Sequence, residues 1–349
     1  MKRPAPSGAA LSRRSALAWA LPLLASAAAL PQPARAMAAQ RRDSRPLLGT
    51  RVDMVAEGGS AAFLAEAMDS AFGEMARLSA MMSRYEPESP LSRINQAAGR
   101  SAVAVPSELM AVLQTGLALH RRTEGWFDMT VGALKSWRFE PGQHGAVPNE
   151  GILAQERSLV DAAGLRLDPA AGRAHLLRPG MALDLGGVAK LPILAAGMRR
   201  LQDWGVANAL INGGGDVLYR GRNQGRPWRV GLRDPRRPQQ VLGVLDLQGQ
   251  GVLAASGDYE RYFIADGQRQ HHILSPRSGR PSQGACGVSL WARNVDLVNG
   301  LGAAFMLGGH GYSRDYLGRT PELQALLVYP DQTVWATSDM QRALRPWAP

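Results

Sequence analysis

The chain contains a single cysteine, Cys286, among 349 residues, so no intrachain disulfide can hold its fold together. The same count excludes a cysteine-based zinc site, an iron–sulfur cluster and a lipid anchor on an N-terminal cysteine. Stability must therefore come from a buried apolar core. The 45% of hydrophobic residues suffices for one or two domains at this length. The composition is not that of a disordered or collagen-like chain.

The first 36 residues have the three-part pattern of an export signal. A basic start that includes Arg13-Arg14 precedes an apolar run over residues 16–30, and Ala34-Arg35-Ala36 resembles a cleavage site. The run is too short for a comfortable membrane span. The arginine pair is typical of a twin-arginine signal, and an ordinary secretory signal is the alternative. We expect a periplasmic protein with one domain over residues 37–349.

The net charge narrows the choice of ligand. The chain carries a formal charge of +11, and residues 1–36 hold five basic and no acidic residues, which leaves +6 on the rest. That excess suits an anionic ligand or a membrane surface. No nucleic-acid motif and no basic stripe interleaved with aromatics is present, so nucleic acid is not an expected partner.

Hydrophobic periodicity predicts helices and antiparallel strands in alternating blocks, which is an α+β fold. Helices are predicted over residues 61–78, 106–123 (with Ser107 as its cap), 191–204 and 295–307. Strands are predicted over residues 47–57, 209–211, 228–232, 241–247, 251–255, 262–265 and 323–329, and a short strand leads from Gly180 into a glycine turn. Residues 37–46 are predicted to be a polar lead-in.

Two polar segments follow predicted helices. The segment Ser83–Asn95 places Tyr85 beside arginines, a combination that can stack on a ring and grip phosphates. A capped join between two helices is the alternative. The segment Phe127–Leu134 contains Asp128 and Thr130, and a tight turn capped by Asp128 is the alternative there.

A third segment, Asp184–Lys190, has the order strand, glycine pair, helix start. Its glycines allow backbone N–H groups to approach a ligand. A helix N-terminus attracts anions, and Lys190 adds a positive charge. The segment fits neither the dinucleotide fingerprint nor the Walker spacing, and a plain turn is the alternative.

Further polar segments lie in the strand-rich half. Three glycines precede Asp216 and indicate either a bulge or a backbone pressed against a ligand. The segments Ser256–Tyr262 and His271–Gly279 bring hydroxyl, carboxylate, guanidinium and imidazole groups together. Neighbouring histidines on a strand face opposite sides, so His271 and His272 do not form a metal pair. One of them could act as a base.

In their order and spacing from about Leu48 to Gly309, these segments resemble the ApbE family, the FAD:protein FMN transferases. The resemblance implies an ApbE-like (T-fold-like) architecture. It also implies that FMN passes from FAD to a threonine or serine hydroxyl of an exported or membrane redox protein and that AMP is released. FAD would be the substrate and Mg²⁺ the cofactor. The family motifs are matched by Ser83–Asn95, Phe127–Leu134, Asp184–Lys190, Gly214–Asp216, Ser256–Arg261 and His272–Gly279.

The resemblance also implies roles for single residues. The candidate catalytic residues are His272, as the base that deprotonates the acceptor, with Asp258 and Arg261. Contacts to FAD are expected from Tyr85, Phe127, Asp128, Met129, Thr130, Asp184, Lys190, Ser256 and Ile273. Metal ligands are expected from the Gly187 carbonyl, Asp296 and Asn299.

The sequence departs from the family pattern at the metal ligands. The family has an aspartate followed four residues later by a serine or threonine, which places two oxygen ligands on one helix face. Here Asp296 is followed by Gly300, and an alignment on Phe305–Gly308 puts Val298 and Gly302 at the two positions. The hydroxyl is missing in both alignments.

Two smaller departures accompany this one. Ser275 stands where the family often has aspartate, and Leu191-Pro192 follows the lysine in place of Gly-Tyr. A non-catalytic FAD-binding protein, acting as a flavin carrier or assembly factor, is therefore the alternative function. A hydrolase that releases FMN and AMP is a third.

Overall fold

The computed structural model describes residues 39–139, 142 and 145–347. The predicted export signal lies outside these residues. The described part combines helices with antiparallel sheets, as the sequence predicts. None of its helices is both long enough and apolar enough to cross a membrane.

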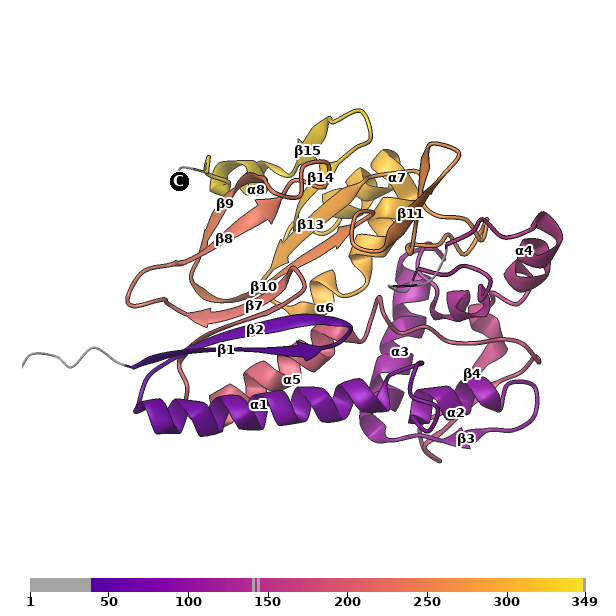
Figure 1. Cartoon of the computed structure of the whole chain (residues 1–349), viewed down its shortest axis with the longest axis horizontal. Coiled ribbons are helices and arrows are strands. Elements are labelled where there is room, and N and C mark those ends of the chain that lie inside the picture. Colours follow the sequence, from indigo (N-terminus) through magenta and orange to yellow (C-terminus); the bar gives the residue numbers. More distant parts are fainter. Residues whose placement is uncertain (1–38, 140–141, 143–144, 348–349) are drawn as a thin grey trace, which may run out of the picture. The chain divides into compact units, whose positions relative to one another are not determined.

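The centre of the fold is an eight-stranded antiparallel sheet in the order β1-β2-β6-β7-β10-β13-β14-β15 (Figure 1). Its strands are β1 (Gln40–Leu47), β2 (Thr50–Glu57), β6 (Asn208–Gly213), β7 (Asp216–Gly221), β10 (Gly249–Gly257), β13 (Gly287–Ala292), β14 (Gln324–Val328) and β15 (Val334–Ala336).

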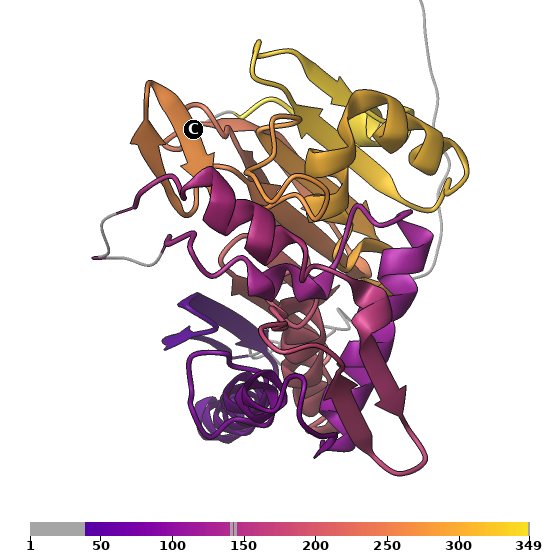
Figure 2. The ribbon, with the colours of Figure 1, turned by 90° about the vertical axis from the view of Figure 1, so that its right-hand side faces the viewer.

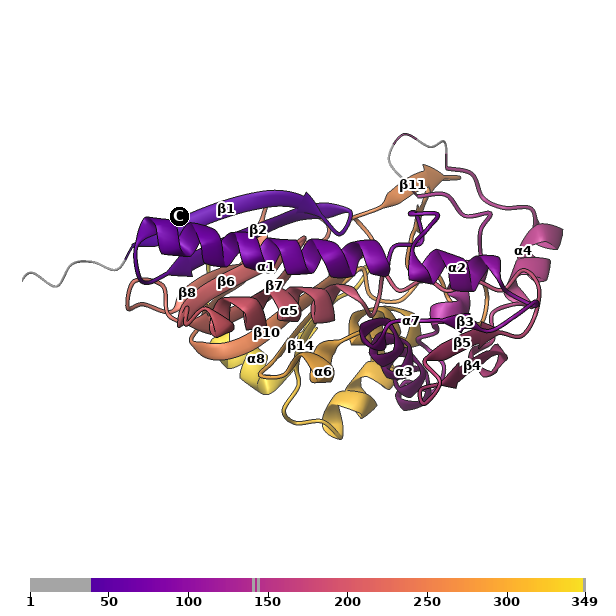
Figure 3. The same ribbon diagram turned by 90° about the horizontal axis from the view of Figure 1, so that it is seen from below.

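Helices cover one face of this sheet. They are α1 (Ala61–Met81), α5 (Lys190–Asp203), α6 (Val295–Val298) and α7 (Leu301–Gly318). Figure 3 shows α1 and α5 lying side by side across the strands. The small sheet β8 (Trp228–Arg233)–β9 (Val241–Leu247) and helix α8 (Ser338–Ala343) pack on the other face.

Alternating side chains on the central strands build the two cores. On β10, Val252 and Ala254 enter the core under the helices, while Leu253 enters the core shared with β8 and β9. On β14, Leu327 and Leu326 divide in the same way. Successive residues of a strand point to opposite faces, so each central strand contributes to both layers.

The remaining elements lie beside the sheet, and Figure 2 views them face on. They are α2 (Pro90–Gln96), α3 (Ser107–Arg122), the 3₁₀ turns η1 (Met129–Ala133) and η2 (Ala162–Gly164), α4 (Glu150–Arg157), the sheet β3 (Val103–Ala104)–β5 (Arg173–Leu176)–β4 (Leu165–Asp168), and the hairpin β11 (Tyr262–Ala265)–β12 (Gln268–His271).

Several predicted boundaries are wrong. The polar lead-in is mostly strand β1, which pairs antiparallel with β2. Ser107 is the first residue of α3, and Pro106 occupies the cap position without a side-chain bond. Residues 181–185 are not part of any strand ladder.

The predicted helix over residues 295–307 is also interrupted. Asn299 ends α6, and Gly300 adopts a left-handed backbone with φ of 74° before α7 begins. A Cβ on Gly300 would lie 2.0 Å from Leu119 Cδ2, so the close approach of α3 requires glycine at this turn.

Candidate active site

Hydrogen bonds to the backbone around Leu183 join the first three polar segments to one another. The Asn95 side chain accepts a hydrogen bond from Leu183 N at 2.7 Å and donates one to Leu183 O at 3.1 Å. The next amide, Asp184 N, donates to Met129 O at 2.8 Å. A Cβ on Gly132 would lie 2.5 Å from the Leu183 carbonyl carbon, so only glycine permits this approach.

Charged contacts join the first and third segments. Arg84 Nη1 lies 3.2 Å from Asp184 Oδ2, and the Arg84 guanidinium lies 5.0 Å from the centre of the Tyr85 ring. Tyr85 is 57% exposed, so a large part of its ring is in contact with solvent. Asp184 also accepts a bond from Gly186 N at 2.7 Å, which fixes the glycine turn.

The second segment, Phe127–Leu134, is held in place by the contacts of Asp128. The alternative for Asp128 is confirmed, because its carboxylate caps η1 by accepting from Thr130 N at 2.8 Å and from Thr130 Oγ1 at 2.6 Å. His120 Nδ1 lies 3.2 Å from the other oxygen of Asp128. This hydrogen bond raises the pKa of His120 against the lowering effect of burial.

Packing decides which members of this segment can touch a ligand. Phe127, Met129 and Thr130 are all at least 94% buried. A Cβ on Gly187 would lie 2.9 Å from Phe127 Cε2, so the glycine turn rests directly on this ring. Thr130 also accepts a bond from Asp161 N at 2.8 Å. These side chains therefore support the glycine turn rather than line an open surface.

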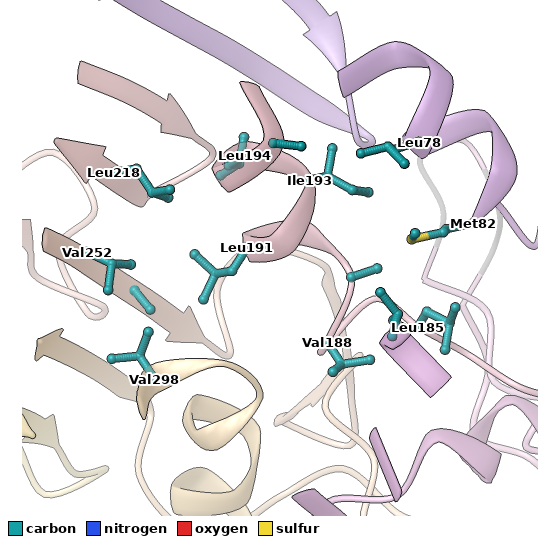
Figure 4. Close-up of a cluster of buried hydrophobic side chains, with 14 of the residues drawn as sticks. Leu78, Met82, Leu185, Val188, Leu191, Ile193, Leu194, Leu218, Val252 and Val298 are labelled. Carbon is teal, nitrogen blue, oxygen red and sulfur yellow. The ribbon is translucent and has the colours of Figure 1, made fainter. Parts of the chain in front are cut away.

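The segment Asp184–Lys190 meets the glycine motif before Asp216 at Lys190, beside strand β10. Its Nζ lies 2.8 Å from Asp216 Oδ2, and Asp216 Oδ1 accepts from Ala255 N at 2.9 Å. Lys190 is the first residue of α5, whose apolar residues Leu191 and Leu194 are buried in the core beneath (Figure 4). That burial fixes the N-terminus of α5 at the site.

The predicted base, His272, is held by the backbone of Arg261. Its Nδ1 lies 3.3 Å from the Arg261 carbonyl oxygen, which can only accept, so Nδ1 carries the proton and Nε2 is unprotonated. Burial, followed by the positive charge of Arg261, lowers the pKa of His272 to about 3. Its neighbour His271 is 3% exposed, and its Nε2 lies 3.0 Å from Ser282 O.

The other predicted catalytic residues occupy different surroundings. Asp258 is buried and pairs with Arg236 at 3.0 Å and Arg269 at 2.7 Å, so its carboxylate is part of an ionic cluster. Arg261 is exposed and contacts His272 through its backbone carbonyl. The structure therefore places Arg261 next to His272. The carboxylate of Asp258 forms ion pairs with Arg236 and Arg269 instead.

Of the predicted metal ligands, Gly187 and Asn299 lie in neighbouring turns, and Asp296 lies at the exposed start of α6. Gly187 is exposed, and its carbonyl oxygen would lie 3.4 Å from a Cβ on Gly300. Asn299 is buried and donates its side-chain amide to Val188 O at 3.0 Å. Asp296 is exposed, and its backbone oxygen accepts from Arg122 at 3.3 Å. Within residues 39–139 and 145–347, no group of three or more His, Cys, Asp or Glu side chains could hold a metal.

The remaining predicted FAD contacts are Ser256 and Ile273. Ile273 is buried, and its carbonyl accepts from Ser282 N at 3.0 Å. Ser256 lies against α7, because a Cβ on Gly302 would be 2.2 Å from Ser256 Oγ. Ser256 also borders a cavity of about 340 Å³ between the main sheet and β8–β9, whose apolar walls include Leu253 and Leu232.

Some site residues were not predicted as such. The glycine motif drew attention to Asp216, but its pairing with Lys190 follows only from the fold. The position of Arg84 next to Tyr85 in the sequence was a signal that could have identified it. His120 had none, because the turn that follows α3 brings Asp128 back to the last turn of that helix.

The model of the ApbE family matches residues 48–327, so the chain belongs to the ApbE family. It is 38% identical over 215 residues to the FAD:protein FMN transferase of Klebsiella pneumoniae, a match that covers 59% of this chain and 66% of that protein. It is 32% identical over 253 residues to the FAD:protein FMN transferase of Rhodobacter capsulatus, covering 71% and 47%. The chain thus spans only part of the length of these relatives.

Solved structures show the same fold. The ApbE protein from Thermotoga maritima aligns with a TM-score of 0.80 at 26% identity, over 88% of this chain and 100% of that one. The flavin transferase ApbE from Vibrio cholerae aligns with a TM-score of 0.76, also at 26% identity and with the same coverage. The predicted ApbE-like α+β architecture is confirmed.

Proposed function

We propose that this chain is an FAD:protein FMN transferase. The observation that carries the proposal is the meeting of the motif segments around the first turn of α5, where Lys190 pairs with Asp216 and Arg84 pairs with Asp184. A helix N-terminus flanked by fixed cations is suited to a pyrophosphate. Tyr85 offers an exposed ring on which a flavin or adenine can stack.

In the proposed reaction, the hydroxyl oxygen of a threonine or serine in the acceptor protein attacks the FMN phosphorus of FAD. A new phosphoester bond forms, the bond to the AMP oxygen breaks, and AMP leaves with that electron pair. The acceptor proton passes to Nε2 of His272, which is unprotonated because Nδ1 donates to the Arg261 carbonyl. Lys190 and Arg84 orient the phosphates and offset their charge, which is most of what phosphoryl transfer requires of a protein.

Family membership also implies a magnesium ion at the pyrophosphate. Magnesium is usually held by one or two carboxylates in addition to substrate phosphates. The Gly187 carbonyl and Asn299 Oδ1 are neutral oxygens, because Asn299 donates only its N–H group to Val188 O, and the carboxylate of the set, Asp296, is exposed on α6. The donor set of this chain does not fit magnesium.

The acceptor is proposed to be an exported or membrane-associated redox protein. We also propose that residues 1–36 direct export to the periplasm by the twin-arginine route. Replacing Arg13 and Arg14 together with lysine should leave the full chain in the cytoplasm. Unchanged export in cell fractionation would contradict the twin-arginine route.

The activity test uses the chain with FAD and a synthetic peptide that contains one threonine. A peptide mass gain of one FMN, with AMP formed in equal amount, supports the transferase. A matched peptide with alanine in place of threonine should gain nothing. FMN and AMP without labelled peptide would indicate a hydrolase.

The missing hydroxyl at the metal position favours one other function, a flavin carrier or assembly factor that binds FAD without transfer. In that case FAD should bind, and neither peptide labelling nor AMP should be detected with any divalent cation. The two functions are therefore separated by the same assay.

A further inference from the structure

The four aspartates of the motif segments are each paired with a cationic or hydrogen-bonding partner. Asp184 pairs with Arg84, and Asp216 pairs with Lys190. Asp128 faces His120, and Asp258 lies between two arginines. A divalent cation would have to displace one of these partners before it could recruit a carboxylate. Asp216, which pairs with the first residue of α5, is bonded through both oxygens.

Val298 on α6 and Gly302 on α7 stand at the positions where the family pattern has side-chain metal ligands. Packing around both positions leaves no room for a metal ligand. Val298 is 1% exposed and lies in the apolar cluster with Val252 and Leu191 (Figure 4). Gly302 has no side chain, and Ser256 Oγ occupies the space that a Cβ there would need. These positions therefore offer a hydrocarbon group and a neutral hydroxyl, and neither can balance the charge of a divalent ion.

We infer that this chain binds the pyrophosphate of FAD without a divalent cation, and that Lys190 and Arg84 meet the phosphate charge in its place. The inference rests on the proposed function for the identity of the ligand. Lys190 is rigidly placed by Asp216 and by the burial of α5, and α5 has no side-chain cap on its N-terminus. Arg84 approaches from the opposite segment. Two fixed cations and a helix N-terminus match the two negative charges of a dinucleotide.

The first experiment measures the cation alone. The full chain, without FAD, is titrated with Mn²⁺, and free Mn²⁺ is followed by electron paramagnetic resonance. We expect no stoichiometric binding in the micromolar range. A family relative that carries aspartate and threonine at the two helix positions serves as the matched control.

The location of any bound Mn²⁺ is then decided by substitution. One equivalent of bound Mn²⁺ that is lost in Ser256→Ala or Asn299→Leu would overturn the inference. Binding that survives both substitutions and leaves FAD affinity unchanged is surface binding, and the inference stands.

The second experiment measures FAD affinity by quenching of flavin fluorescence, once with EDTA and once with millimolar Mg²⁺. We expect the dissociation constants to agree within about twofold. A tightening by Mg²⁺ of about tenfold or more would overturn the inference. If FAD does not bind under either condition, the proposed function fails, and the Mn²⁺ titration of the unliganded protein still decides whether a cation site exists.

Discussion

Lys190 Nζ and Asp216 Oδ2 lie 2.8 Å apart and join the start of α5 to the glycine turn before β7. The Asp216 side chain is 7% exposed and that of Lys190 is 29% exposed, so the pair lies at the boundary between core and solvent. At such a boundary, one end of the lysine is fixed while its charge remains available to an anion. The pair is thus both a structural join and a candidate phosphate contact.

Replacing this lysine should separate the two roles. We expect Lys190→Met to weaken FAD binding by about tenfold, because one charge-assisted contact is lost. The melting temperature should also fall, since Asp216 is left buried without its partner. The double variant Lys190→Met/Asp216→Asn should recover the melting temperature but not the affinity. Lys135→Met is the matched control and should change neither; equal loss of affinity in both variants would refute the role of Lys190.

Replacing His272 should affect the chemical step alone. We expect His272→Asn to lower the rate of FMN transfer by about 10²–10⁴-fold while the FAD dissociation constant changes by less than about twofold. Because the pKa of His272 is lowered to about 3, its protonation should not reduce the rate between about pH 5 and pH 8. His310→Asn, at an exposed position, is the control. A transfer rate that survives in His272→Asn would assign the base elsewhere.

The His120–Asp128 pair should make stability depend on pH. The pKa of His120 is raised above its ordinary value of 6.5, so above pH 6.5 the folded chain binds more protons than the unfolded chain. The contribution is fully present below pH 6.5 and is lost as the pH rises through the raised pKa. We expect the melting temperature of the wild type to fall more steeply over this window than that of His120→Gln. Parallel curves for the two proteins would contradict the pairing.

The contact between Gly302 and Ser256 predicts a steric coupling. We expect Gly302→Ala to lower the free energy of unfolding by about 1–2 kcal/mol, because the new methyl group meets Ser256 Oγ and Cβ. The double variant Gly302→Ala/Ser256→Gly should lose less than the sum of the single changes. Gly73→Ala, on the exposed face of α1 with nothing within 4 Å, should stabilise the protein by up to about 1 kcal/mol. Additive losses in a denaturant titration would argue against the contact.

The sequence was sufficient where a segment's own pattern decides its structure. The apolar stripe of α1 and that of α5 follow helical spacing, and both helices were predicted to within a few residues. Strand β1 was missed because it is an edge strand rich in charge, with Pro46 where no partner needs its amide. Its burial comes from α1, where the Arg45 guanidinium lies 4.3 Å from the centre of the Phe72 ring.

The sequence predicted which segments form the site, but not how these segments are arranged relative to one another. The motifs indicated which segments carry polar groups, and the spacing within each motif gave no distance between them. The contacts Arg84–Asp184 and Asn95–Leu183 join residues that are far apart in the chain, so they follow only from the folded topology. The break at Gly300 likewise depends on Leu119 of α3, which no local pattern reveals.

The division of β10 between two cores restricts how this strand can change during evolution. Val252 and Ala254 face the helices and Leu253 faces β8–β9, so inserting one residue here would exchange the two sets of side chains. The same slip would turn Ser256 away from α7 and detach the Ala255 amide from Asp216. Length differences among relatives should therefore collect in the turns that flank β10, and the strand itself should tolerate exchange of side chains but not of register.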